Sequence, residues 1–234
     1  MKVKNAIIMA AGVGERLRPL TLTTPKPLIK VNGVPMIESV IEAIRKNGIE
    51  EIYVVVGYQA EKFQYLSEKY PGLTLIKNPY YLEANNISSM YVARDHLGDS
   101  IVLDGDQIIY NPDILNPEFT RSGYNVIWCE GETKEWILDV QNGIINGCSQ
   151  DGGSLGYQLY SISRWSEEDG RRLASLVAGE FEGGNTGIYW DDVPLFYYPD
   201  EFELGIMEMQ PGDVIEIDSF RELMEVDASY GEGL

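Results

Sequence analysis

The sequence has very little histidine and cysteine. Its 234 residues include one histidine, His96, in a segment with a helical pattern, and two cysteines, Cys129 and Cys148, without the spacing of a metal site. A Ser-His-Asp or Cys-His catalytic arrangement is therefore not credible. No apolar run approaches the roughly 18 residues that a membrane span needs, and the N-terminus lacks the long apolar segment of a signal peptide. Free thiols suit a reducing compartment, so we expect a cytoplasmic protein without a membrane partner.

Positive charge is also scarce. The chain has 18 Lys and Arg residues against 37 Asp and Glu residues, which gives a net charge of −19. Such a surface repels nucleic acid, so we expect no nucleic-acid partner. Any bound phosphate needs cations concentrated at one place, either a few basic side chains or a metal ion. Hydrophobic residues make up 44% of the chain, which is enough for the core of one domain.

Strand-like and helix-like segments alternate through residues 1–110, and residues 111–234 are richer in β-structure. The predicted strands are 5–10, 52–56, 73–76, 101–103, 126–129, 136–140, 143–145, 157–162, 202–209 and 214–217. The predicted helices are 37–44, 59–69, 87–97, one from Ser166 to about Ala178, and one capped by Ser219. This order predicts an α/β fold, a Rossmann-like three-layer α/β/α architecture with a mostly parallel mixed sheet. We expect one domain over 1–234, with a β-rich insertion that covers a substrate.

A glycine-rich string follows the first predicted strand. It reads Gly12-Val13-Gly14-Glu15-Arg16-Leu17-Arg18-Pro19-Leu20-Thr21, and a Pro25-Lys26 pair comes soon after. Glycines let backbone N–H groups approach a polyphosphate, Arg16 can fork onto phosphate oxygens, and Lys26 adds a second charge. The string is neither a Walker A loop nor the dinucleotide fingerprint. Taken alone, the two glycines fit a tight turn equally well, and Arg16 fits a solvated surface.

Two carboxylates follow the buried strand 101–103. Asp104 and Asp106 flank a glycine where the carboxyl end of the strand meets the crevice in which α/β proteins bind ligands. Mg²⁺ prefers such hard oxygen ligands together with phosphates. Asp-Gly-Asp is also a common turn sequence, so these residues alone leave both interpretations open.

The whole glycine string with its lysine resembles the signature of the sugar-phosphate nucleotidyltransferase superfamily, Gly-x-Gly-x-Arg-Leu-x-Pro-Leu-Thr followed by Pro-Lys. It departs at Glu15, where Thr or Ser is common. The resemblance implies a nucleotide-binding half over 1–110 and an acceptor-binding half over 111–234. It assigns triphosphate binding to the backbone of Ala11, Gly12, Val13 and Gly14 with the Arg16 side chain, catalysis to Lys26 and Arg16, and Asp104 to the nucleotide site. It also implies that Asp106 and Asp218 hold Mg²⁺, with Glu216 as the alternative to Asp218. On its own, Asp218 fits a helix cap or a strand end better.

The segment before the third predicted helix bears on the nucleotide. Asn85-Asn86 and Ser88-Ser89 are similar to the bacterial CTP:phosphocholine cytidylyltransferases, and their donors and acceptors suit the edge of a pyrimidine. The alternative is an asparagine cap with serines in the first helical turn.

Aromatic and acidic residues in the second half bear on the acceptor. Trp136 follows Glu135, and the string Tyr189-Trp190-Asp191-Asp192 comes later. Aromatic faces and carboxylates hold a trimethylammonium group, which has no N–H to donate. The competing interpretation places the aromatics in the core and the aspartates on the surface.

We therefore expect a Mg²⁺-dependent enzyme that transfers CMP from CTP to phosphocholine, giving CDP-choline and pyrophosphate without a covalent intermediate. The acceptor phosphate is already anionic near pH 7, because its second pKa is about 6, so the reaction needs no catalytic base. The same chemistry on phosphoethanolamine, 2-aminoethylphosphonate or a sugar 1-phosphate is the alternative. A non-catalytic nucleotide sensor is a remote one. The sequence leaves open whether the protein is a monomer or a homodimer.

Overall fold

Four parallel strands form the first half of one large sheet. The computed structural model describes residues 1–231 of the chain. In it the first four strands lie in the order β5 (Leu73–Lys77), β4 (Glu51–Val56), β1 (Asn5–Ala10) and β6 (Ser100–Asp104). All neighbouring pairs among them are parallel. Every residue of β1 is buried, as expected for a strand covered on both faces.

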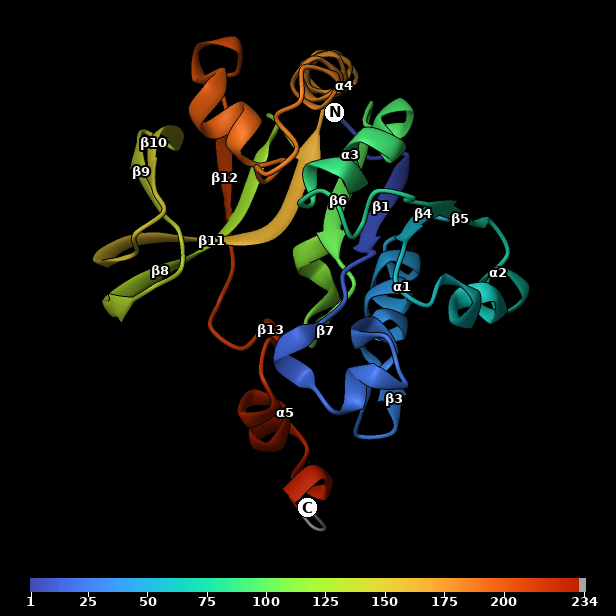
Figure 1. Ribbon diagram of the computed structural model, residues 1–234. Helices are drawn as coiled ribbons and strands as arrows, with labels where there is room; N and C mark the ends of the chain where they lie inside the picture. The colour runs from blue at the N-terminus through green and yellow to red at the C-terminus, as the bar shows by residue number, and fades with distance from the viewer. Residues whose placement is uncertain (232–234) are drawn as a thin grey trace.

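The second half of the chain continues the same sheet. The order after β6 is β11 (Gly153–Trp165), β8 (Gly123–Thr133), β12 (Gly205–Glu208), β10 (Ile144–Ser149) and β9 (Ile137–Gln141). β11 runs antiparallel to β6 and to β8, whereas β12 is parallel to β8. In Figure 1, β8 and β11 curve away from the parallel strands and carry β9 and β10 at their far end. The predicted mostly parallel mixed sheet is confirmed.

Helices cover both faces of the sheet, and a hydrophobic cluster lies between the sheet and the helices on each face. Helices α1 (Met36–Lys46) and α2 (Gln64–Lys69) contribute to one cluster, and α3 (Ile87–Ala93) and α4 (Glu167–Glu182) contribute to the other. This gives the predicted three layers (Figure 1). The Ser166 side chain caps α4 as expected, and the helix extends beyond Ala178, to Glu182. None of the helices in residues 1–231 has the length and apolar character needed to cross a bilayer.

Two short ribbons lie at the edge where β1 and β6 end. β7 (Gln107–Ile109) pairs antiparallel with β13 (Val214–Glu216), and β2 (Lys30–Val31) pairs with β3 (Val34–Pro35). The register places Glu216 opposite Gln107, directly after Asp106. Helix α5 (Phe220–Val226) follows, and Ser219 forms a capping box at its start. The β7–β13 ribbon therefore brings residues about 110 positions apart in the sequence into one site.

Candidate active site

A hollow of about 460 Å³ lies at the carboxyl ends of β1 and β6. Its walls combine the glycine loop, the ends of both strands, and the β13–α5 connection. The charged residues lining it are Glu15, Arg16, Lys26, Asp104, Asp106, Glu216 and Asp218. Four residues that the sequence predicted to act together, Arg16, Lys26, Asp106 and Asp218, thus share one hollow.

The glycine loop presents unpaired backbone donors beside this hollow. Within residues 1–231, the N–H groups of Val13, Gly14, Glu15 and Arg16 have no hydrogen-bond acceptor. Backbone N–H groups are ordinarily paired, and a run of free ones forms a concave anion site. Gly14 has a φ of 69°, and a Cβ there would lie 2.9 Å from the Cβ of Lys26. Glycine is therefore required both by the backbone conformation and by the close approach of Lys26.

Lys26 is the central cation of the hollow. Its ammonium group bonds to Asp106 and lies 2.6 Å from Oδ1 of Asp218. The same oxygen of Asp218 lies 2.9 Å from the guanidinium of Arg16, whose side chain is 71% exposed. Burial disfavours the charge on Lys26, but Asp106 and Asp218 more than offset this and raise its pKa above the ordinary value. Lys26 is consequently a permanent positive charge held between two carboxylates.

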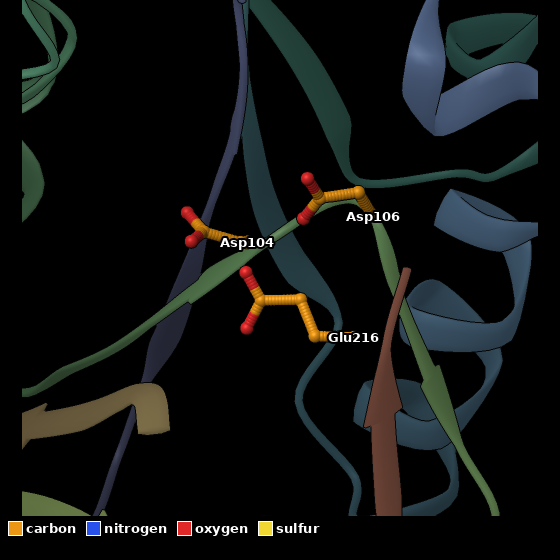
Figure 2. Close-up of side chains that lie close together, drawn as sticks. All are labelled: Asp104, Asp106 and Glu216. Carbon is orange, nitrogen blue, oxygen red and sulfur yellow. The ribbon is translucent and has the colours of Figure 1, made fainter. Parts of the chain in front are cut away.

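Asp104, Asp106 and Glu216 form a group of carboxylates (Figure 2). One carboxylate oxygen of each lies within 4.8 Å of the others. Burial, followed by the charge of neighbouring Asp106, raises the pKa of Asp104 and of Glu216 well above the usual range. Oδ1 of Asp106 is buried and has no hydrogen-bond partner among the described residues. Three converging hard oxygen donors, one of them unpaired, fit Mg²⁺.

Of the two residues predicted as the second metal ligand, Glu216 lies in this group of carboxylates and Asp218 does not. Asp218 contacts Lys26 and Arg16, and it is not a member of the three-carboxylate group. Glu216, which the sequence offered as the alternative, lies beside Asp106 because it is the last residue of β13 and pairs in register with Gln107. Asp218 lies beyond the ribbon, and its backbone N–H donates to the side chain of Glu222.

The residues assigned to base recognition lie at the start of α3, and they do not line the hollow. Ser88 is buried; its hydroxyl donates to the carbonyl of Asn85 and accepts from the amide of Asn78. Asn86 accepts from the backbone N–H of Trp190 at 2.9 Å, and Asn85 accepts from the N–H of Asn86. The Asn86 bond joins the start of α3 to Trp190. The hydroxyl of Ser88 is occupied by Asn85 and Asn78, so in this structure it bonds within the protein.

Trp190 is a core residue, contrary to its assignment as a wall of a cation cage. Its side chain is 5% exposed. Its ring centroid lies 6.3 Å from Tyr124 and 6.1 Å from Trp165, both of which are fully buried. The string around Trp190 looked like a cage because sequence does not distinguish a buried indole from an exposed one.

Two of the other acceptor candidates, Trp136 and Tyr189, lie nearer the surface. Trp136 is half-buried and packs edge to face with Tyr189, at a centroid distance of 5.8 Å. Oδ1 of Asp191 is buried without a partner among the described residues, and burial raises the pKa of this carboxyl to about 7. Asp192 is also buried and accepts hydrogen bonds from the N–H of Tyr189 and from Gln150. The competing interpretation, which placed both aspartates on the surface, therefore does not describe Asp192. Of the predicted aromatics, only Trp136 and Tyr189 form an accessible pair.

A second hollow, of about 400 Å³, adjoins the first and shares Glu216 and Asp218 with it. Its polar lining adds Glu135, Gln158, Tyr160 and Glu222. The sequence analysis missed Gln158 and Tyr160, because both lie inside the long strand β11 and no motif surrounds them. The one available signal was that side chains alternate between the two faces of a strand, and this alternation does not tell which face meets a ligand.

Relatives with known activities match almost the full length of the chain. The profile of the Nucleotidyl transferase family matches residues 5–116. A 2-aminoethylphosphonate cytidylyltransferase from Lancefieldella rimae is 42% identical over 229 residues, which cover 97% of this chain and 93% of that protein. The choline-phosphate cytidylyltransferase of Streptococcus pneumoniae is 34% identical over 232 residues, which cover 95% of this chain and 97% of that protein.

Solved structures agree with these sequence matches. The CTP:phosphocholine cytidylyltransferase of Streptococcus pneumoniae matches with a TM-score of 0.88 and 35% identity, over 97% of this chain and 99% of that one. The inositol-1-phosphate CTP transferase of T. maritima, at 17% identity and a TM-score of 0.78, shows a shared fold. This chain is therefore an enzyme of the nucleotidyltransferase family, and within that family it belongs with the cytidylyltransferases.

Proposed function

We propose that this enzyme transfers CMP from CTP to a small acceptor that carries a phosphoryl group at one end and a cationic nitrogen at the other. The observation that carries the proposal is the single hollow in which free N–H groups, Arg16 and Lys26 face a carboxylate cluster. An acceptor oxygen forms a bond to the α-phosphorus of CTP. The bond from the α-phosphorus to the bridging oxygen breaks, and pyrophosphate leaves.

The protein's own groups account for most of what this reaction needs. The loop N–H groups of residues 13–16 and the guanidinium of Arg16 bind the triphosphate oxygens. Lys26 stays charged because of Asp106 and Asp218, and it neutralises the negative charge that gathers when two anions meet. A phosphate acceptor is already anionic near pH 7, so the enzyme has to align two repelling anions and needs no general base.

Asp104, Asp106 and Glu216 are the residues that would hold Mg²⁺. When bound, the ion would supply Lewis-acid neutralisation of phosphate charge. The three carboxylates need a counter-charge of their own, because burial together with mutual repulsion raises the pKa of Asp104 and of Glu216. Lys26 reaches Asp106 in this group.

We favour 2-aminoethylphosphonate as the acceptor. A primary ammonium group donates hydrogen bonds, and the second hollow offers it the acceptors Glu135, Gln158 and Glu222 with one aromatic ring, Tyr160. The core position of Trp190 removes one wall from the cage that a trimethylammonium group would need. The 42% identity to a 2-aminoethylphosphonate cytidylyltransferase supports the same choice.

Phosphocholine is the second candidate, and a separate observation favours it. Trp136 and Tyr189 form an accessible aromatic pair, and Asp191 and Asp192 lie directly after Trp190 in the same segment. Aromatic faces backed by carboxylates suit a quaternary ammonium group. The choline-phosphate cytidylyltransferases of Streptococcus pneumoniae and Haemophilus influenzae, at 34% and 32% identity, support this alternative.

Pyrophosphate release from CTP tests the proposal. We expect release with 2-aminoethylphosphonate and Mg²⁺, a lower kcat/KM with phosphocholine, phosphoethanolamine or glucose 1-phosphate, and none after chelation. A higher kcat/KM with phosphocholine would assign the second candidate. Glu135→Gln should weaken the apparent affinity for 2-aminoethylphosphonate more than that for phosphocholine. Trp136→Ala should have the opposite effect and weaken the apparent affinity for phosphocholine more than that for 2-aminoethylphosphonate. Absence of release with every acceptor would contradict the proposed function.

A further inference from the structure

Tyr58 connects the two ends of the glycine loop. It follows β4 by two residues, and its backbone N–H donates to the carbonyl of Ala11 at 3.1 Å, where the loop begins. Its phenolic hydroxyl donates to the carbonyl of Thr21 at 2.8 Å, where the loop signature ends. One residue outside the loop thus fixes the distance between the start and the end of the loop.

Thr21 continues this connection into the middle of the loop. Its side chain is 1% exposed, and its hydroxyl donates to the carbonyl of Gly14 at 2.9 Å. The N–H of Leu17 donates to the same carbonyl at 3.1 Å. A Cβ on Gly14 would lie 3.0 Å from the Cγ2 of Thr21, so the threonine methyl packs directly against the glycine.

The fixed carbonyl determines where the next N–H points. In a planar trans peptide, the C=O of Gly14 and the N–H of Glu15 point in opposite directions. Because Thr21 and Leu17 hold the carbonyl on one side, the N–H of Glu15 is held on the other. Gly14 and Glu15 both line the hollow, and the N–H of Glu15 has no acceptor within residues 1–231.

We propose that Thr21 and Tyr58 are positioning residues that hold the glycine loop in its phosphate-binding conformation before the nucleotide arrives. The inference rests on the proposed function, in which this loop binds the triphosphate. A preorganised loop binds more tightly because its ordering has already been completed in the free enzyme. Neither side chain lines the hollow, so both act through the loop backbone.

A matched pair of variants tests the role of the Thr21 hydroxyl. Thr21→Val removes the hydroxyl and keeps the shape, whereas Thr21→Ser keeps the hydroxyl and removes the methyl. Isothermal titration with CTP, inorganic tripolyphosphate and cytidine should show about tenfold weaker binding of both phosphate ligands to Thr21→Val. Thr21→Ser should stay within about threefold of the wild type, and cytidine should bind all three proteins alike.

Tyr58→Phe should weaken CTP and tripolyphosphate binding in the same direction. Its control is Tyr53→Phe, which removes a tyrosine hydroxyl that bonds to Glu51 outside the hollow and should leave CTP binding unchanged. In kinetics, the KM for CTP should rise in Thr21→Val and Tyr58→Phe while the KM for the acceptor stays constant. A general loss of structure would instead change both KM values and the binding of cytidine, and this outcome would overturn the inference.

The two proposals fail in different ways. Equal tripolyphosphate affinity in the wild type, Thr21→Val and Tyr58→Phe would overturn the positioning role and leave the proposed function standing. A wild-type enzyme that bound tripolyphosphate but turned over no CTP would contradict the proposed function, and the variants would still report on Thr21 and Tyr58 through tripolyphosphate. Equal weakening by Thr21→Ser and Thr21→Val would assign the effect to packing and would also overturn the inference.

Discussion

A buried carboxyl makes the stability of this protein depend on pH in a calculable way. Burial raises the pKa of Asp191 to about 7, against an ordinary value of 3.8. Asn has the shape of the protonated carboxyl and carries no charge at any pH. We therefore predict that Asp191→Asn is more stable than the wild type at pH 8 and much closer to it at pH 4.

The sign follows from the protons bound in each state. Below about pH 3.8, Asp191 carries its proton in both the folded and the unfolded chain. Between this pH and about 7 only the folded state keeps the proton, so the free energy of unfolding falls as the pH rises, and it levels off above about 7. A gap of about three pH units, at ~1.4 kcal/mol per unit, sets the full effect at about 4 kcal/mol.

Urea unfolding at pH 4, 6 and 8, followed by tryptophan fluorescence, measures this effect as the difference in the free energy of unfolding between Asp191→Asn and the wild type. That difference cancels the other carboxyl groups and should grow with pH towards about 4 kcal/mol. Asp139→Asn, at an exposed position of β9, is the matched control and should show a difference below about 0.5 kcal/mol at each pH. A difference between Asp191→Asn and the wild type that did not change from pH 4 to pH 8 would refute the reasoning.

Three further predictions concern activity. Lys26→Met should lower kcat by about 10² to 10³, because it removes the central preorganised charge, while circular dichroism shows an intact fold; a near-normal rate would reject this role. Asp106→Asn should raise the Mg²⁺ concentration at half-maximal rate by about tenfold or more, since it removes one of the three carboxylates proposed to hold the ion; unchanged Mg²⁺ dependence would place the ion elsewhere. Trp136→Ala should raise the KM for phosphocholine more than the KM for CTP; initial rates measured with each substrate varied in turn check this, and a larger rise in the KM for CTP would contradict it.

Local patterns predicted the first half of the fold and the basic residues that share its hollow. Each signal there lies within a short stretch: the apolar run of β1, the glycine string behind it, and Lys26 a few residues later. The chain has little freedom between these points, so sequence spacing translates into spatial proximity. The capping roles of Ser166 and Ser219 were predictable for the same reason, because a cap and its helix are neighbours in the chain.

Contacts between distant segments decided the rest. Glu216 and Asp218 are both acidic and stand two residues apart in the sequence. Only the register of β13 on β7 places Glu216 beside Asp106, whereas Asp218 forms an ion pair with Lys26. Burial decided the role of Trp190, because the same indole serves as a cage wall when exposed and as core when packed on Tyr124. Residue type and spacing thus determined the chemistry available at the site. Tertiary packing determined which group meets which, because strand register and burial depend on partners far away along the chain.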